Sequence, residues 1–391
     1  MTTSRSPADR PDWNPYSSAE GEDQIALYDE MRRRCPVAHN EALGWSLFRH
    51  PDVMRALDDP ATFSNAVSAH VSVPNGMDPP QHTEYRRIIE PYFAIDRMAA
   101  LEPRCRTIAQ DAVAALGEGE VDVMESFADE FALRAQCAFL NWPVELHRPL
   151  REWVRRNHEA TRSRDRSRMA AVAFEFDRHI RGVLDARRTA GPDAGSDIAS
   201  ELLREQVGGR NLTDEEIVSI LRNWTVGELA TISACIGILI GFLAEHPELQ
   251  AQLRRMPARL AEAIDEILRI DSPLMTSRRL TKQAVEIRGR TIDASERITL
   301  MWAAANRDEQ VFEHPERFEF DRNPALNLLY GAGIHVCPGA PLARLELRVL
   351  METLLAAVDI SSVDGDPPTR AMLPAGGYSR CPVRLRRRTQ G

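Results

Sequence analysis

The stretch YGAGIHVCPGAPLARLE, residues 330–346, restricts the fold more than any other part of this sequence. Three glycines and two prolines surround one cysteine, Cys337, and a helix-like apolar pattern follows at once. A cysteine just before a helix has its sulfur near free backbone N–H groups and the positive end of the helix dipole, which favours the thiolate. Gly333 and Gly339 allow the backbone to turn and approach other groups closely. The stretch therefore predicts a thiolate on a tightly shaped loop.

Such a thiolate suits three tasks: a nucleophile, a zinc ligand or an axial ligand of haem iron. A nucleophile needs a neighbouring base, for which His335 is a candidate. Zinc needs several further ligands, and only His335 is close in sequence. Spacing alone leaves these alternatives open.

The composition narrows the class of protein. The 391 residues carry a net charge of −9, and no basic run is long enough to form a nucleic-acid-binding stripe. The N-terminus lacks the apolar segment of a signal peptide, and the most apolar run, residues 229–243, is too short to span a bilayer. The six cysteines are scattered and include no CxxC pair, which favours a reducing compartment. We expect a soluble, cytoplasmic protein that binds neither nucleic acid nor membrane.

Helical periodicity dominates the chain, and strand-like pieces are short: residues 42–48, parts of 284–302 and the far C-terminus. We expect a mainly α fold with a small peripheral β-sheet, a flexible segment over residues 1–20 and a single domain over residues 21–391. The predicted helices are 21–34, 79–92, 97–116, 120–140, 146–160, 167–188, 213–245, 248–256 and 258–270.

The predicted helix 213–245 is the longest. Thr213 and Glu216 have the spacing of a capping box, and Pro247 follows the end of the helix. At 1.5 Å per residue it would be roughly 50 Å long. Its apolar second half must be buried on most sides, so a carboxylate near its middle, Glu228, is costly unless it is paired or needed.

The opening stretch resembles the haem-binding loop of the cytochromes P-450 in residues 331–339 and in Leu342, Ala343, Arg344 and Glu346. Three further segments match motifs of that family in the family's order, so the resemblance covers nearly the whole chain. They are DPPQHTEYRR at 78–87, the ExxR motif EILR at 266–269, and ANRD at 305–308 with Phe312, Pro315 and Phe318. The resemblance implies a P-450 fold whose long central helix lies over haem b.

The resemblance also implies a role for each matched position. Cys337 would be the thiolate ligand of the haem iron, and Gly339 belongs to the same cofactor-binding loop. His82, Arg86, Arg279 and His335 would bind the two haem propionates. His82 and Arg86 share one helical face, and the alternative is that they form surface pairs with Glu84 or Glu90.

Two structural roles follow from the resemblance as well. Asp78 would cap the helix that Pro79 opens. Glu266, Arg269 and Arg317 would form a buried salt-bridged triad that fixes the fold around the haem.

The sequence departs from the family in its central helix, which usually carries an acid directly before a threonine to deliver protons during the reaction with dioxygen. Counting back from His246 places the threonine at Thr231, but Ala230 precedes it. Glu228, three residues upstream, lies roughly one turn away and is the candidate replacement. Glu228 could instead pair with an arginine, and Thr231 could bond back to a backbone carbonyl.

A second departure is the short segment between Ser64 and Asp78, which leaves little room for the small helix that normally covers the pocket. A short lid favours an open pocket and a bulky or extended substrate.

The resemblance implies a haem-thiolate monooxygenase that hydroxylates or demethylates an organic small molecule. Electrons would come from a separate ferredoxin and ferredoxin reductase, with Arg344 and Arg348 as candidate docking residues. The alternatives are an oxidative aryl or peptide cross-linking enzyme of natural-product biosynthesis, a peroxide-driven peroxygenase, and a haem-based sensor or carrier.

Overall fold

The structure of the protein, a computed structural model, describes residues 12–16, 24–68, 70–163, 165–191, 197–373 and 375–388. Most of the segment predicted to be flexible, 1–20, lies outside these residues. The chain forms two compact units, each assembled from segments distant in sequence. The sheet unit contains Met1–Ala69, Asp265–Cys337 and Thr369–Gly377, and the helical unit contains His70–Ile264, Pro338–Pro368 and Tyr378–Gly391. The single domain over 21–391 remains a prediction.

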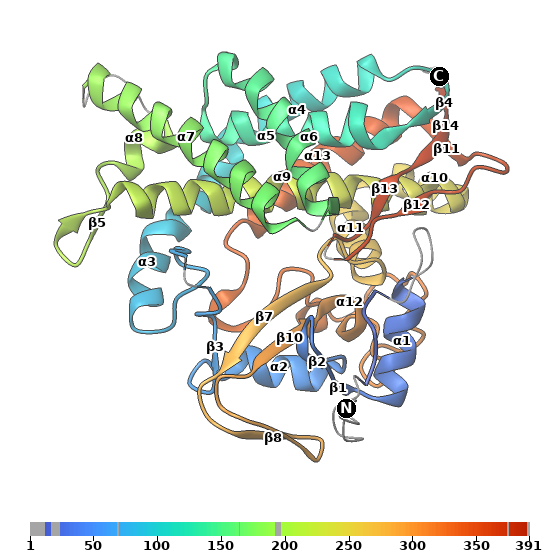
Figure 1. Ribbon diagram of the computed structural model, residues 1–391. Helices are drawn as coiled ribbons and strands as arrows, with labels where there is room; N and C mark the ends of the chain where they lie inside the picture. Colours follow the sequence, from blue (N-terminus) through green and yellow to red (C-terminus); the bar gives the residue numbers. More distant parts are fainter. Residues whose placement is uncertain are drawn as a thin grey trace. The chain divides into compact units, whose positions relative to one another are not determined.

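The helical unit confirms most of the predicted helices, and the chain as a whole is mainly helical, as expected. Within this unit α13 packs along α4, and α9 packs against α5 and α7 (Figure 1). The helices are α3 (Gln81–Ile89), α4 (Ile95–Ala115), α5 (Glu130–Leu140), α6 (His147–Ser163), α7 (Arg166–Ala190), α8 (Ile198–Leu202), α9 (Asp214–Glu245), α10 (Pro247–Arg255) and α13 (Ala340–Ala357), while α11 (Leu260–Ile270) runs from this unit into the sheet unit.

The prediction of one helix over 120–140 was wrong at its start. Residues 119–122 form strand β4 (Gly119–Asp122), which a π-helical turn, Met124–Asp129, joins to α5. The strand pairs with β14 (Pro382–Arg387), which in turn pairs with β11 (Val358–Ser362), so that β14 is the middle strand of an antiparallel sheet. Strand β13 (Tyr378–Arg380) and the hairpin of β5 (Gln206–Val207) and β6 (Arg210–Asn211) complete the strands of this unit.

The central helix α9 forms as predicted. The Thr213 hydroxyl accepts from the N–H of Glu216, and the Glu216 carboxylate accepts from the N–H of Thr213, which completes the capping box. The helix is long and apolar enough to cross a membrane, but 72% of its most apolar window is buried inside the structure. Burial of this kind is typical of a core helix.

The sheet unit is built on five strands. Their order is β1 (Val37–Asn40), β2 (Gly44–Leu47), β10 (Arg297–Met301), β7 (Thr276–Thr281) and β3 (Phe63–Ser64), with only the β2–β10 pair parallel. Buried Leu47, Leu57, Ile298 and Leu300 belong to one apolar core of this unit. Its other elements are α1 (Gln24–Arg34), α2 (His50–Asp58), α12 (Trp302–Ala305), the hairpin of β8 (Val285–Ile287) and β9 (Arg290–Ile292), and β12 (Thr369–Arg370).

The predicted triad of Glu266, Arg269 and Arg317 was wrong in its third member. Glu266 and Arg269 are buried and bonded through two contacts, 2.8 and 2.9 Å. The second cation on Glu266 is Arg322, whose Nε lies 2.9 Å from Oε1. Arg317 provides a backbone carbonyl to Arg269, 3.4 Å away, while its own side chain is 67% exposed. Spacing along the chain could not distinguish the two arginines, because only the path of the loop decides which guanidinium turns inward.

We expect Arg322→Ala to destabilise the protein by about 1–3 kcal/mol, because it removes a hydrogen bond from a buried carboxylate. The matched variant Arg317→Ala should change stability by less than about 0.5 kcal/mol, since its side chain is exposed. Urea unfolding midpoints of both variants measure the difference. A larger loss for Arg317→Ala would contradict this assignment of the network.

Candidate active site

The loop before α13 holds Cys337 in the way that its glycines predict. The N–H of Cys337 donates to the carbonyl of Tyr330, 2.8 Å away, which closes the loop, and Cys337 is exposed. Gly331 and Gly333 have φ of 72° and 67°, in the left-handed region that favours glycine. A Cβ on Gly333 would lie 2.4 Å from the carbonyl oxygen of Leu57, so only glycine lets the loop approach α2 this closely.

Gly339 does not adopt the left-handed backbone conformation that favours glycine. Its φ is −78°, an ordinary value, and it is the N-cap residue of α13. Its carbonyl accepts from the N–H of Ala343 at 3.0 Å and so begins the helical ladder. The conformational requirement in this loop therefore lies before the cysteine, at Gly331 and Gly333.

Two predicted propionate ligands belong to the sheet unit together with Cys337. Arg279 is a buried residue of β7, and its Nη1 donates to the carbonyl of Arg278 at 2.7 Å and to Ser277 Oγ at 3.3 Å. His335 is half-buried and ends the short 3₁₀ turn Gly333–His335, two residues before the cysteine. The other predicted site residues belong to the helical unit.

His82 and Arg86 lie on one face of α3, as predicted. His82 is buried, and burial followed by the charge of Arg86 lowers its pKa. The Arg86 side chain is only 11% exposed, and its Nε donates to Glu90 at 2.8 Å, so the surface pair that we considered is present. The prediction that Asp78 caps this helix was wrong: Pro80 is the N-cap residue, and Asp78 accepts through its backbone carbonyl from the N–H of His82.

The middle of α9 exposes a strip of small residues. Gly227 and Ala230 are exposed and Thr231 is half-buried, whereas residues 232–241 are all buried. The Thr231 hydroxyl donates to the carbonyl of Gly227 at 2.6 Å, which is the back-bond that we considered from the sequence. This strip therefore places one hydroxyl beside two exposed small residues.

Glu228 points away from this strip into the protein. Its Oε1 is buried, and among the described residues no arginine pairs with it, so the arginine alternative is not observed. Its neighbour is a second acid, Glu346 of α13, which is completely buried. Burial raises the pKa of Glu228, and a hydrogen bond from Glu346 partly offsets this. Burial, the charge of Glu228 and their mutual hydrogen bond raise the pKa of Glu346 well above its usual value.

Sequence reasoning did not predict a role for Glu346, although it ends the opening stretch. The available signal was a carboxylate between Leu345 and Leu347, in a helix whose pattern requires burial of that face.

The segment that replaces the lid helix is attached to α9. Among the described residues of 65–80, which omit Ala69, there is no helix, as predicted. The N–H of Val73 donates to Ser219 Oγ at 2.9 Å, and the Ser219 hydroxyl donates to the carbonyl of Val71 at 3.1 Å. Asn223 Nδ2 donates to the carbonyl of Val73 at 3.0 Å. The short segment is therefore held by a set of polar side chains on one helix.

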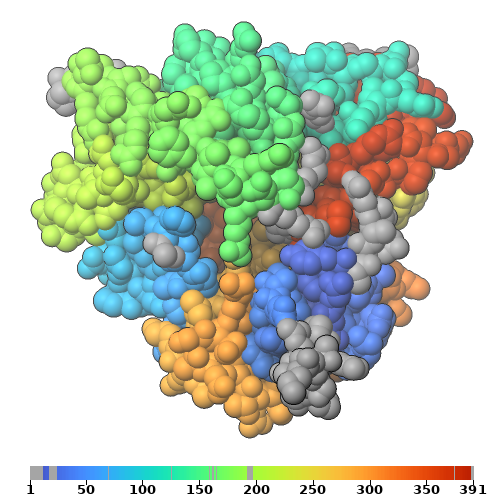
Figure 2. All heavy atoms as spheres, viewed as in Figure 1, coloured from blue at the N-terminus to red at the C-terminus, as the bar shows by residue number. Residues whose placement is uncertain are grey.

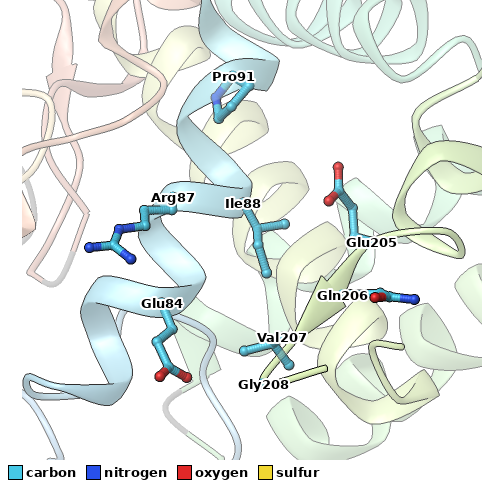
Figure 3. Close-up of a pocket in the computed structure, with 8 residues that line it drawn as sticks. All are labelled: Glu84, Arg87, Ile88, Pro91, Glu205, Gln206, Val207 and Gly208. Carbon is cyan, nitrogen blue, oxygen red and sulfur yellow. The ribbon is translucent and has the colours of Figure 1, made fainter. Parts of the chain in front are cut away.

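A surface pocket of about 370 Å³ lies where α3 meets the β5–β6 hairpin (Figure 3). In the space-filling view, the light-blue surface of the α3 region lies next to the yellow-green surface of the hairpin region (Figure 2). Arg210 of the hairpin binds Glu216, which also accepts a hydrogen bond from the Tyr85 hydroxyl of α3. Figure 3 shows Arg87 and Glu84 on α3 and Glu205 across from them. None of the predicted site residues lines this pocket, and its open, charged lining gives no reason to treat it as the catalytic centre.

The predicted site residues fit a haem group by their chemistry. Cys337 is a soft ligand on a loop whose backbone leaves its side chain exposed. His82, Arg86, Arg279 and His335 offer the cationic and N–H groups that carboxylates bind.

Comparisons with known proteins agree with this chemistry. The family model for cytochrome P450 matches residues 138–379. The chain is 30% identical to the cyclomarin C epoxidase of Salinispora arenicola over 371 residues, which cover 90% of this chain and 93% of that protein. It is also 30% identical to the erythromycin C-12 hydroxylase of Saccharopolyspora erythraea, over 88% of this chain and 90% of that protein.

Among solved structures, a mutant of P450 EryK in complex with erythromycin B is similar, with a TM-score of 0.86 and 27% identity. The match covers 96% of this chain and 100% of that chain.

We expect Gly333→Ala to destabilise the loop, because the added Cβ meets the carbonyl of Leu57 and because a positive φ costs alanine roughly 1–2 kcal/mol. Gly117→Ala is the matched control, since a Cβ there meets nothing within 4 Å. Thermal unfolding midpoints should fall for the first variant only. Equal midpoints for both variants would contradict the close approach to α2.

Proposed function

Since this chain belongs to the cytochrome P450 family and so is a haem-thiolate monooxygenase, we propose that it hydroxylates or epoxidises a bulky natural product. The relatives described above are a hydroxylase and an epoxidase, which favours oxygen insertion over oxidative coupling. The observation that carries the proposal is the strip of α9 in which Gly227 and Ala230 are exposed beside half-buried Thr231, directly before the buried residues 232–241. The absence of a lid helix in the described part of 65–80 favours a large substrate.

We propose that Cys337 is the thiolate ligand of haem b and that His82, Arg86, Arg279 and His335 hold its propionates. Gly339 belongs to the same binding loop, and residues 21–391 act as one catalytic domain. Haem b held by these residues would supply the chemistry of dioxygen activation and oxygen insertion. The other steps of this proposal are proton transfers by residues of α9.

Thr231 and Glu228 are the proposed proton-handling residues. The Thr231 hydroxyl lies on the exposed strip and donates to the carbonyl of Gly227, which leaves its oxygen as an acceptor there. Glu228 supplies that position with protons, because Ala230 has replaced the acid expected next to the threonine. Burial raises the pKa of Glu228, which favours the protonated form that a proton donor needs.

The enzyme takes electrons from redox partner proteins and acts on small molecules, as its family does. We propose a separate ferredoxin and ferredoxin reductase in the cytoplasm as the electron source. Of the two candidate docking residues, Arg348 already binds Glu102 and Glu352, at 2.7 and 2.9 Å. A docking role for it would therefore involve this network rather than an isolated charge.

An optical titration of the ferric protein tests the substrate class. We expect a saturable shift from low to high spin with macrolides or similarly large natural products, and a weaker response with small terpenes. Exclusive binding of small terpenes would contradict a bulky substrate. A response only to aromatic peptides would instead favour oxidative cross-linking.

Cys337→Ser should abolish the thiolate signature in the spectrum of the reduced carbon monoxide complex, because a serine hydroxyl does not replace the soft sulfur ligand. Cys381→Ser is the matched control, since Cys381 is a buried cysteine beside Gly241 of α9 and is not the proposed haem ligand. This variant should keep the thiolate signature. An unchanged spectrum in the Cys337 variant would refute the assignment.

Glu228→Gln should slow dioxygen-driven turnover about tenfold or more, since general acid catalysis typically contributes at least that much. Turnover driven by hydrogen peroxide should change less, because peroxide already carries the protons that dioxygen lacks. Rates with both oxidants in the same preparation make the comparison. Equal losses would indicate that Glu228 is structural.

A further inference from the structure

One buried hydrogen-bond donor of the sheet unit is the indole N–H of Trp302. This residue begins α12, it is only 7% exposed, and its Nε1 atom is buried. Among the described residues, none accepts a hydrogen bond from this nitrogen. A tryptophan N–H is a donor only, and a buried one usually finds an acceptor, because an unpaired N–H in a core costs free energy. The indole therefore indicates an acceptor on a bound group.

Trp302 lies beside the loop that leads to Cys337. A Cβ on Gly331 would be 3.9 Å from the Cη2 atom of the indole ring. Ala332, the next residue of the loop, packs against the apolar core that contains Trp302. The indole is therefore adjacent to the loop of the proposed iron ligand.

The sheet places Trp302 and Arg279 on one side. Ile298 and Leu300 of β10 belong to the same apolar core as Trp302, whereas the intervening residue Met301 belongs to a second core. Arg279 of β7 is paired directly with Ile298, and residues opposite each other in antiparallel strands project from the same face. A buried cation and a buried N–H donor therefore share this face.

A carboxylate is the acceptor that fits these two donors. Arg279 supplies a positive charge, and a hydrogen bond to a charged acceptor is stronger than one between neutral groups. The carbonyl of Arg278 and the hydroxyl of Ser277, which already accept from Nη1 of Arg279, are both neutral. Haem b carries two propionate carboxylates, and Arg279 is among the residues proposed above to bind them.

We propose that Trp302 is a further haem-binding residue, whose indole N–H donates a hydrogen bond to the propionate that Arg279 binds. This inference rests on the proposed binding of haem b. The apolar part of the ring packs in the core beside the Cys337 loop, and its one polar atom contacts the cofactor. Haem binding thereby satisfies a donor that is already buried, which adds to the affinity for the cofactor.

Four variants separate the N–H of Trp302 from its packing. Trp302→Phe keeps an aromatic ring and removes the donor. Trp302→Gln and Trp302→Met have side chains of similar length, but only glutamine has an N–H, on a nitrogen two bonds beyond Cγ as in the indole. Trp45→Phe is the control, since Trp45 of β2 packs against the same core and its ring contacts Arg290.

Haem dimethyl ester, in which both propionates are uncharged, makes the test specific for the carboxylates. Each ferric holoprotein is prepared with haem b or with the ester, and loss of the cofactor to an excess of apomyoglobin is followed optically. The ratio of the ester loss rate to the haem loss rate measures how strongly the protein holds the propionate charges. A packing defect changes both rates alike and leaves this ratio unchanged.

We expect the ratio to fall about tenfold or more in Trp302→Phe and Trp302→Met, the equivalent of one lost hydrogen bond to a charged group. It should stay within about threefold of the native value in Trp302→Gln and Trp45→Phe. The thiolate signature of the reduced carbon monoxide complex should be the same in all four variants, because Cys337 is intact.

An unchanged ratio in Trp302→Phe would overturn the inference. If that variant does not fold, the comparison of Trp302→Met with Trp302→Gln decides, and equal ratios in these two would overturn it. A displaced thiolate band in Trp302→Phe would instead assign the N–H to the sulfur of Cys337.

The proposed function can fail separately. A protein that takes up haem without a thiolate signature would refute the role of Cys337, while the ratio would still test Trp302. A protein that binds no haem would refute both.

Discussion

Burial of α9 imposes the strictest requirement on the helical unit. Residues 232–241 of this helix are all buried, and each fully buried Ile or Leu side chain contributes about 1.5–3 kcal/mol. The helix is covered by α5, α7, α13 and strand β11, so every polar group that it carries inward needs a partner. Thr225 accepts a hydrogen bond from Gln136 at 3.2 Å, and Ser219 binds the segment at Val71 and Val73.

Glu228 satisfies the same requirement in a different way, since its partner is another acid. Burial raises the pKa of both groups, and protonation of either one removes the repulsion between them, so the pair can be buried without a cation.

The sheet unit has a different constraint, the close approach of the Cys337 loop to α2. Gly333 lies against the carbonyl of Leu57 and has a positive φ. Four residues later, the side chain of Cys337 is exposed. Glu266, Arg269 and Arg322 link α11 to the segment that leads to this loop, through contacts of 2.8–2.9 Å. Rigid support of this kind keeps the Cys337 loop in one geometry.

The sequence by itself determined those features whose residues lie close together along the chain. The capping box and apolar run of α9, the glycines before Cys337 and the common face of His82 and Arg86 all depend on residues within a few turns of one another. Cys337, His82 and Thr231 could therefore be assigned from motif and register. Only the tertiary structure decided the partners that are distant in sequence. Pairing with β14 made residues 119–122 a strand, the path of a loop selected Arg322 over Arg317, and the packing of α13 on α9 placed Glu346 beside Glu228. Such choices depend on which side chains share a buried space, and no local pattern encodes that.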